Sequence, residues 1–285
     1  MEPLYPTVSH LMLKSSYGLN ASIGNAINST TILKSAITNR QYQNDQQTAI
    51  NIQDLQNLDL TWEKKYEFNA GTDIGFFKER LIVTGDYYRR RSFDLVGLVR
   101  TSGIGGEVYQ YANYADMQSH GVDFSVTARV VQQKDWSISS TFNFGWNITK
   151  ITNLKSNPNI WSLVGEGGGA QQGYPVRGLF SIRNRGLDPY LGYPLFLNDS
   201  GQISPVVNLA SLNTSYLKYE GPTDPTITGG WSNTFRYGPF TLNVLLTYQA
   251  GNKIRLRPAY ASIYSDLDAL PNEFKKDSNC PATRN

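Results

Sequence analysis

The sequence predicts an all-β fold of long antiparallel strands, and three observations carry this prediction. Apolar and polar residues alternate over several extended segments, which is the period of a β-strand with two unlike faces. Aromatic residues make up 12% of the chain and charged residues only 17%, against roughly 25% charged residues in soluble domains. The connections between the alternating segments are short and long in turn, which indicates hairpins with unequal ends.

Residues 135–149 form the clearest predicted strand. The even positions of this segment, from Trp136 onward, are almost all apolar, whereas the odd positions, including Thr141 and Asn143, are small or polar. Because successive side chains of a strand point to opposite faces, this segment has one apolar and one polar face. Six further segments repeat the pattern, and an eighth strand is left open after Ile254. The seven predicted strands lie near residues 10–20, 60–75, 80–92, 117–131, 135–149, 226–237 and 240–254.

The predicted connections alternate in length along the chain. Antiparallel strands with tight turns at one end and long loops at the other are typical of bacterial outer-membrane barrels. Soluble sandwiches rarely need three long loops on one side. We therefore predict an antiparallel transmembrane β-barrel segment with short periplasmic turns and long extracellular loops. The short turns lie near residues 75–79, 132–134 and 237–239, and the long loops span about residues 21–59, 94–116 and 150–224.

The spacing of the tryptophans fits the height of a membrane. Trp136 and Trp146 share the apolar face and lie ten residues apart, which is roughly 33 Å along a strand. Tilted by about 45°, this length becomes roughly 23 Å along the barrel axis, close to the lipid-facing band of about 25 Å that aromatic girdles border. We therefore expect Trp136, Trp146 and Trp62 to lie at the lipid interfaces.

The polar faces of the predicted strands carry carboxylates, hydroxyls and amides. We expect Asp73, Asp123, Thr141 and Asn143 to line a water-filled lumen, where such groups stay hydrated. Paired carboxylates are also the catalytic groups of most glycosidases. We favour lumen lining over catalysis, because a wet barrel interior accounts for these carboxylates without a reaction.

Motifs and composition argue against several other functions. The chain has two histidines, His10 and His120, and neither has a second ligand at metal-binding spacing. Cys280 is the single cysteine, which excludes an intrachain disulfide. The basic run at residues 89–91 holds three charges, too few for a nucleic-acid surface. Since no nucleophile elbow, phosphate-binding loop or complete dinucleotide fingerprint is present, we expect no enzyme activity, no metal and no cofactor.

Aromatic residues in the long predicted loops are the candidates for substrate contact. Exposed aromatic rings stack on sugar rings and hold peptides, and the same rings can instead pack the loops against one another. The sequence leaves both interpretations open. The candidates are Tyr109, Tyr111, Tyr114, Trp161 and Tyr174.

A series of short stretches carries a further indication. They are residues 57–63 (NLDLTWE), 75–77 (GFF), 80–81 (RL), 86–88 (DYY), 117–123 (MQSHGVD), 173–175 (GYP), 186–189 (GLDP), 192–194 (GYP), 222–225 (PTDP), 229–231 (GGW) and 248–253 (YQAGNK). Singly each stretch is weak, but their order and spacing from about residue 10 to about residue 260 make the series specific. The series resembles the second half of the barrel of SusC/RagA-type TonB-linked outer-membrane proteins, which often have proline in place of Leu58.

The resemblance implies a barrel of about 22 strands, to which this chain would contribute about seven or eight. It also implies an N-terminal plug, a TonB box that couples to the TonB complex, and a SusD-like surface lipoprotein as partner. Such importers take up oligosaccharides or peptides through the outer membrane. The sequence shows no signal peptide, plug or TonB box, so we expect a partial TonB-dependent receptor barrel in contact with outer-membrane lipid.

Two other interpretations remain open at the level of the sequence. The first is a self-contained small outer-membrane barrel, acting as an adhesin or a pore. The second is a soluble β-rich carbohydrate-binding module or glycosidase, in which the apolar faces would point into a dry interior. The direction in which the apolar faces point separates the membrane interpretations from the soluble one.

Overall fold

A computed structural model describes residues 7–22, 30–39, 46–54, 56–100 and 109–256 of the 285-residue chain. Cys280 and most of the segment after Ile254 lie outside these residues, and so does most of the eighth strand that the sequence leaves open. The chain divides into two compact units, and each is described by itself. The first unit comprises Met1–Ser156 and Ile227–Tyr248, and the second comprises Asn157–Thr226 and Gln249–Asn285.

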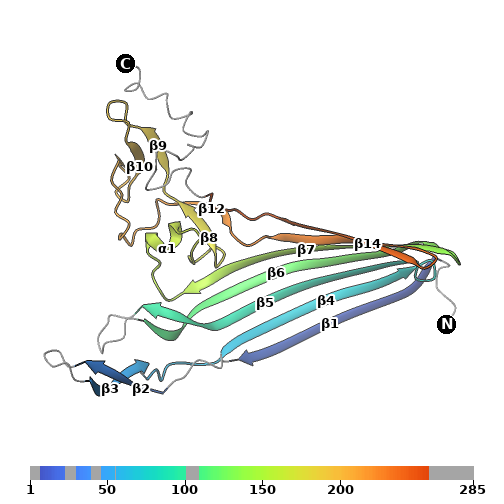
Figure 1. The fold of residues 1–285 in the computed structure, drawn as a ribbon, viewed down its shortest axis with the longest axis horizontal. Helices are drawn as coiled ribbons and strands as arrows, with labels where there is room; N and C mark the ends of the chain where they lie inside the picture. Colours follow the sequence, from blue (N-terminus) through green and yellow to red (C-terminus); the bar gives the residue numbers. More distant parts are fainter. Residues whose placement is uncertain (1–6, 23–29, 40–45, 55, 101–108, 257–285) are drawn as a thin grey trace. The chain divides into compact units, whose positions relative to one another are not determined.

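The first unit is built on one antiparallel sheet of seven strands (Figure 1). Sequential neighbours pair as hairpins, and the order across the sheet is β1-β4-β5-β6-β7-β13-β14. Each of the seven strands overlaps one of the segments in which the sequence predicts a strand. Their bounds are β1 Val8–Ser22, β4 Glu63–Phe76, β5 Leu81–Arg100, β6 Tyr109–Gln132, β7 Trp136–Leu154, β13 Ile227–Tyr237 and β14 Phe240–Ala250.

The tight turn between β4 and β5 has an unusual backbone. Phe77, Lys78 and Glu79 all have positive φ angles, of 53°, 57° and 62°, which costs non-glycine residues energy. Two hydrogen bonds, to Thr7 just before β1 and to Ser9 within it, hold this turn. The Phe77 N–H donates to the Thr7 carbonyl oxygen over 2.9 Å, and the Lys78 N–H donates to Ser9 Oγ over 2.6 Å. The start of β1 therefore stabilises a turn that is distant from it in sequence.

The strands at the other end continue further than the sequence predicts. The expected loop at residues 94–116 is largely strand, because β5 runs to Arg100 and β6 begins at Tyr109. The register between these strands shifts between Ser92 and Leu95, and Asp94 has a φ of 56°. Such a β-bulge inserts a residue and breaks the alternation of apolar and polar side chains. The period-two pattern therefore ends at the bulge although the strand does not.

The other two long connections also contain regular structure. The connection at residues 21–59 holds a hairpin of β2, Ile32–Asn39, and β3, Gln46–Asp54. The connection at residues 150–224 supplies most of the second unit. Its elements are α1 Ile160–Val164, β8 Gly178–Ser181, β9 Asn184–Leu187, β10 Pro194–Leu197, β11 Ile203–Ser204 and β12 Lys218–Pro222.

The second unit has a hydrophobic core of its own. Ile160 and Leu163 of α1 are fully buried and pack with Phe180, Tyr216 and Leu217. Asn159 caps α1, since its side-chain oxygen accepts a hydrogen bond from the Ser162 N–H over 2.8 Å. Within the described residues, no helix has the length and apolar character needed to span a membrane.

The pairing register gives the seven-stranded sheet two unlike faces. One row across the sheet places Ile74, Val83, Val126, Phe142 and Trp231 side by side. The adjacent row, which projects to the opposite face, contains Asp73, Thr84, Ser125, Asn143 and Gly230. We call these the apolar face and the polar face of the sheet.

The apolar face is open rather than packed in an interior. Leu13 of β1 is 77% exposed and Phe240 of β14 is 75% exposed, and Phe142 in the middle of the sheet is still 40% exposed. An exposed apolar surface of this extent is not tolerated in water by an isolated soluble domain. The sheet therefore needs an apolar environment on this face.

Candidate functional site

The polar face carries a charged cluster on its first three strands. Lys14 of β1 lies 3.2 Å from a carboxylate oxygen of Asp73 on β4 and 3.3 Å from one of Asp86 on β5. The lysine reaches both carboxylates because Gly71, which pairs with both Lys14 and Asp86, presents no side chain between them. One ammonium group thus bridges three neighbouring strands.

A second group of charges lies further along the same strands. A carboxylate oxygen of Glu67 on β4 lies 3.1 Å from Arg90 Nε on β5, and the other lies 2.7 Å from the ammonium of Lys65. The Arg90 guanidinium also lies over the ring of Tyr88, 4.2 Å from its centroid, a distance typical of a cation–π contact. Both signs of charge therefore alternate along this part of the polar face.

Neutral polar groups continue the polar face across β6 and β7. Ser125 Oγ donates to Asn143 Oδ1 over 2.8 Å, and the hydroxyls of Thr127 and Thr141 lie 3.1 Å apart. These are cross-strand pairs, since the residues of each pair lie opposite one another in the register. The groups remain accessible on the face and can exchange hydrogen bonds with water or with a polar solute.

Asp123 of β6 lies at the centre of the polar face. It is opposite Asp86 in the register, so two carboxylates stand on adjacent strands. Gly145 faces Asp123 from β7 and leaves room for its carboxylate. The side chains around this position border a shallow hollow of about 300 Å³. The hollow is lined on the polar face by Thr84, Asp86, Asp123, Ser125, Asn143 and Thr228.

The structure places the predicted lumen residues together. Asp73, Asp123, Thr141 and Asn143 all lie on the polar face, distributed over β4, β6 and β7. Sequence reasoning did not single out Lys14, which pairs with Asp73. Arg90 was not singled out either, although it shares the phase of the polar positions of β5. Lys65, Glu67 and Asp86 lie on the polar face as the alternation of the sequence predicts.

The predicted interface tryptophans lie in two settings. Trp136 and Trp146 are on the apolar face of β7, at positions that alternate with Thr141 and Asn143. The Trp146 ring contacts the imidazole of His120, with centroids 5.6 Å apart. Trp62 precedes the first residue of β4 and is 56% exposed.

The predicted loop aromatics do not form one cluster. Tyr109, Tyr111 and Tyr114 are residues of β6 and not of a loop, since β6 begins at Tyr109. Trp161 lies on α1 and is 69% exposed. Tyr174 packs instead against the second unit's core, with its ring centroid 5.1 Å from that of Phe180 and 4.7 Å from that of Tyr219.

Burial and hydrogen bonding shift the pKa values of three groups in the second unit. Burial raises the pKa of the Tyr216 and Tyr219 hydroxyls above their usual value. The hydrogen bond to Asp224 raises the pKa of the Arg177 guanidinium, and the Arg177 Nε donates to Asp224 Oδ2 over 3.0 Å. Within the described residues, no three His, Cys, Asp or Glu side chains lie close enough to hold a metal ion.

A long-stranded antiparallel sheet with an open apolar face, a hydrated polar face, tight turns at one end and elaborate connections at the other defines a wall of an outer-membrane β-barrel. Residues 8–259 match the family model described as TonB dependent receptor-like, beta-barrel. The chain therefore belongs to the TonB-dependent receptor β-barrel family, whose members are proteins of the outer membrane. The predicted fold class and location are confirmed.

Relatives of known name agree with this assignment. The TonB-dependent receptor P3 of Formosa agariphila is 26% identical over 240 residues, which cover 74% of this chain and 23% of that protein. The TonB-dependent receptor SusC of Bacteroides thetaiotaomicron is 32% identical over 99 residues, or 34% of this chain and 10% of SusC. The resemblance to SusC/RagA-type proteins is thus confirmed, and the chain spans about a quarter or less of the length of these relatives.

Solved structures give the same answer for the fold. The structure of the RagAB peptide transporter contains a chain that superimposes with a TM-score of 0.69 at 27% identity, over 87% of this chain and 27% of that one. The RagAB peptide importer in the "open-open" state matches with a TM-score of 0.66 at 28% identity. The family to which this chain belongs is therefore one of receptors and transporters rather than one of enzymes.

Proposed function

We propose that this chain forms part of the wall of an outer-membrane importer that takes up oligosaccharides or peptides with energy from the TonB complex. The polar face lines the transport path, and the apolar face contacts lipid. The observation that carries the proposal is the separation of these two faces across seven strands, with Asp73, Asp123, Thr141 and Asn143 on one and Trp136 on the other.

The composition of the polar face suits passage rather than chemistry. Several of its charges are neutralised in pairs, such as Lys14 with Asp73 and Glu67 with Arg90. Its hydroxyls and amides present many weak, exchangeable hydrogen bonds, which allow a polar solute to bind and leave. The names of the relatives support the solute class: RagAB is a peptide transporter.

The long connections are the proposed capture elements. In the orientation that the tight turns define, the long connections lie on the extracellular side. Trp161, at 69% exposure, and the strand-end residues Tyr109 and Tyr111, at 54% and 44%, present open aromatic rings for a sugar or peptide. Tyr114 and Tyr174 complete the proposed contact set, with Tyr174 supporting the fold of the second unit. We further propose that a SusD-like surface lipoprotein closes over these connections.

A cysteine-accessibility experiment tests the orientation of the two faces. Asn143→Cys and Phe142→Cys are made in the complete gene product that contains this chain, with Cys280 replaced by serine, and each variant is reconstituted into lipid nanodiscs. A charged maleimide reacts only where water reaches the thiol. We expect the cysteine at position 143 to react at least about tenfold faster, because position 142 points into hydrocarbon. Equal rates, or a faster reaction at 142, would refute the proposed orientation.

A transport experiment tests the path itself. Asp123→Lys reverses a charge in the central hollow of the polar face, and Asp135→Lys makes the same change in the exposed turn before β7. We expect the first variant to lower uptake of cationic peptides more than uptake of neutral oligosaccharides or anionic peptides, and the second to leave uptake unchanged. Normal uptake of every solute by the Asp123 variant would remove this face from the transport path.

A further inference from the structure

Three consecutive arginines of β5 divide between the two faces of the sheet. Arg90 projects to the polar face and pairs with Glu67. Arg89 and Arg91 alternate with it and therefore lie on the apolar face. Among the described residues, no carboxylate forms an ion pair with either of them. The apolar face thus carries two positive charges without a counter-charge, close together on one strand.

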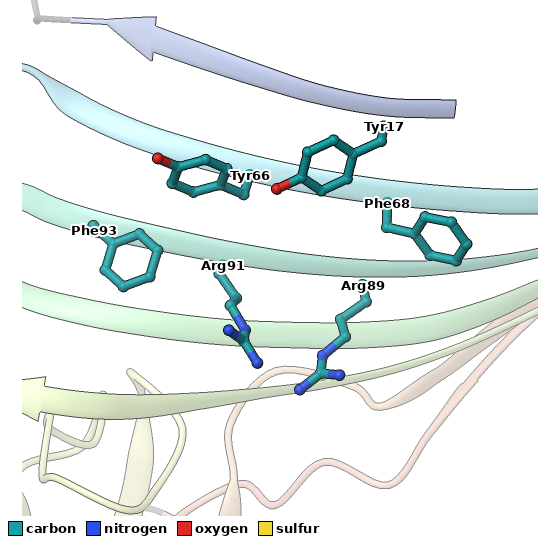
Figure 2. Close-up of a pocket in the computed structure, with 6 residues that line it drawn as sticks. All are labelled: Tyr17, Tyr66, Phe68, Arg89, Arg91 and Phe93. Carbon is teal, nitrogen blue, oxygen red and sulfur yellow. The ribbon is translucent and has the colours of Figure 1, made fainter. Parts of the chain in front are cut away.

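Aromatic rings surround the two guanidinium groups on one side. The rings of Tyr66 and Phe93 meet edge to face with centroids 5.8 Å apart, and Tyr17 stacks on Tyr66 at 6.5 Å. Together with the arginines these rings border a hollow of about 320 Å³, which is open to the surroundings of the sheet. The hollow is lined by Tyr17 of β1, Tyr66 and Phe68 of β4, and Arg89, Arg91 and Phe93 of β5 (Figure 2).

The neighbouring strand β6 orients the arginines from the other side. With its Oε1 turned toward Arg89, Gln118 accepts hydrogen bonds from Arg89 Nη2 over 3.1 Å and from Arg89 Nε over 3.2 Å. Arg91 lies directly opposite Gln118 in the register. A second hollow, of about 180 Å³, is bordered by Arg91, Phe93 and Gln118. Arg91 therefore borders both hollows. Arg89 is held by the neutral amide of Gln118, which does not compensate its positive charge.

The height of these arginines follows from the strand geometry. Leu81 is the first residue of β5 after the tight turn, and Arg91 follows ten residues later, as Trp146 follows Trp136 on β7. Ten residues span roughly 33 Å along a strand and roughly 23 Å along the axis of a barrel with strands tilted by about 45°. Arg91 therefore lies at the edge of the lipid-facing band, on the side of the long connections.

The side chains on either side of this level change in character. Toward the tight turns the apolar face of β5 presents Val83 and Tyr87, and that of β6 presents Phe124 and Val122. The next positions on the same face, toward the long connections, are polar on both strands: Arg89 and Arg91 on β5, and His120 and Gln118 on β6. This change is the pattern expected where the hydrocarbon ends and the headgroups of the outer leaflet begin.

We propose that Arg89 and Arg91, with the aromatic hollow beside them, bind the phosphate headgroup of a lipid in the outer leaflet of the membrane. A guanidinium group offers parallel N–H donors that match two phosphate oxygens, which makes arginine a preferred phosphate ligand. The Tyr17, Tyr66 and Phe93 rings contact the apolar part of the same lipid. This site lies on the face away from the transport path. The proposal therefore does not depend on which solute the barrel imports.

Lipid binding can be measured on the complete gene product that contains this chain, purified in a neutral detergent. The probes are phosphatidylglycerol, zwitterionic phosphatidylcholine and free inorganic phosphate, and native mass spectrometry counts the lipids retained. We expect the protein to retain phosphatidylglycerol in preference to phosphatidylcholine, with retention that weakens as salt is raised. Free phosphate at millimolar concentration is expected to displace little of the lipid, because it lacks the part that contacts the rings.

Paired substitutions assign the binding to these residues. Arg89→Gln with Arg91→Gln removes both charges, and we expect it to weaken phosphatidylglycerol retention by about tenfold or more. Arg80→Gln with Arg129→Gln removes two exposed charges at the tight-turn end and is expected to leave retention unchanged. Arg89→Lys with Arg91→Lys keeps the charge but loses the parallel donors, so retention is expected to fall between those of the wild type and the glutamine pair. Heat-dependent migration on a denaturing gel verifies that each variant folds.

Several results would overturn the proposal. Equal retention of phosphatidylglycerol by the wild type and the glutamine pair removes the arginines from the site. An equal loss in the Arg80/Arg129 pair shows a general effect of charge. Full displacement by inorganic phosphate shows an anion site without a lipid. A change from dimer to monomer in the glutamine pair assigns this face to contact between copies. Should the glutamine pair fail to fold, the lysine pair decides, since unchanged retention in it excludes parallel donation to phosphate.

Discussion

Introducing arginine at two adjacent positions of β7 tests the assignment of the two faces, and carrying out the folding with and without lipid separates a membrane wall from a soluble sandwich. Phe142 lies on the apolar face and Thr141 on the polar face, opposite Val126 and Thr127 respectively. Position 142 is six residues from Trp136 and four from Trp146. Along a barrel axis these separations are roughly 14 Å and 9 Å. Phe142 is therefore close to the midplane of the lipid, where a charge is most costly.

The expected loss of folding free energy in Phe142→Arg has two contributions. An arginine on the lipid face near the midplane costs about 2–4 kcal/mol, and loss of the ring contact with Tyr248, whose centroid lies 6.3 Å away, costs about 1 kcal/mol more. A total of about 3–5 kcal/mol changes the folding equilibrium by a factor of about a hundred to a few thousand. Thr141→Arg loses the hydroxyl contact with Thr127, at 3.1 Å, which is worth roughly 1 kcal/mol, and its side chain enters water.

The assay is reversible folding into phospholipid vesicles across a urea series, followed by tryptophan fluorescence and by heat-dependent gel migration. We expect Phe142→Arg to shift the midpoint strongly and Thr141→Arg to shift it little. In a soluble sandwich the polar face of β7 would be the solvent side and the apolar face a dry core, and folding would not require vesicles. Cooperative folding without lipid or detergent, or a larger cost at position 141 than at 142, would contradict the membrane placement of this sheet.

Three further changes test the packing on which the sheet and the second unit depend. Gly121→Ala is expected to destabilise the barrel by about 1–3 kcal/mol, because a Cβ there would meet the Tyr88 hydroxyl at 2.5 Å, whereas Gly18→Ala meets nothing within 4 Å and serves as the control in the same urea series. Phe180→Ala, which empties a site only 2% exposed, is expected to cost the second unit about 3–5 kcal/mol and to open residues 157–226 to limited proteolysis; the exposed Tyr190→Ala should not. Above about pH 10 the second unit is expected to lose stability. The pKa values of Tyr216 and Tyr219 are raised in the folded state, so the folded state releases these protons at a higher pH than the unfolded state does. Protease sensitivity between pH 9 and 11 measures the loss, and Tyr219→Phe should raise the pH at which cleavage begins.

The strands of the seven-stranded sheet and the assignment of their faces were predictable because both follow from local properties of the chain. Two-residue alternation around Thr141, Phe142 and Asn143 fixes which side chains share a face, whatever the strand pairs with. The alternating lengths of the connections and the spacing of Trp136 and Trp146 predicted the membrane context, which the family match confirms. Tight turns were predictable for the same local reason, since Gly238 takes a positive φ of 52° where the chain reverses between β13 and β14.

The contacts between strands were not predictable, because they depend on register. Lys14 and Asp86 are far apart in sequence, and their ion pair exists only because β1 and β5 flank β4 in one alignment. The bulge at Asp94 likewise hides the continuation of β5, since an inserted residue inverts the alternation beyond it. No helical or strand periodicity in the sequence predicts the core of the second unit, because Ile160, Phe180 and Leu217 come from a helix, a strand and the end of a loop.

One scale of depth connects the separate observations on the apolar face. In the proposed placement, Trp136 and Trp146 lie at the two edges of the lipid-facing band and Phe142 lies near its middle. Arg91 follows ten residues after the first residue of its own strand. The cost of an arginine on a lipid-facing strand falls from about 2–4 kcal/mol at the midplane to about 0–1 near the interface. The same residue type is therefore expected to be destructive at position 142 and tolerated at position 91. This contrast depends only on height within the membrane, because both positions lie on the same face of the same sheet.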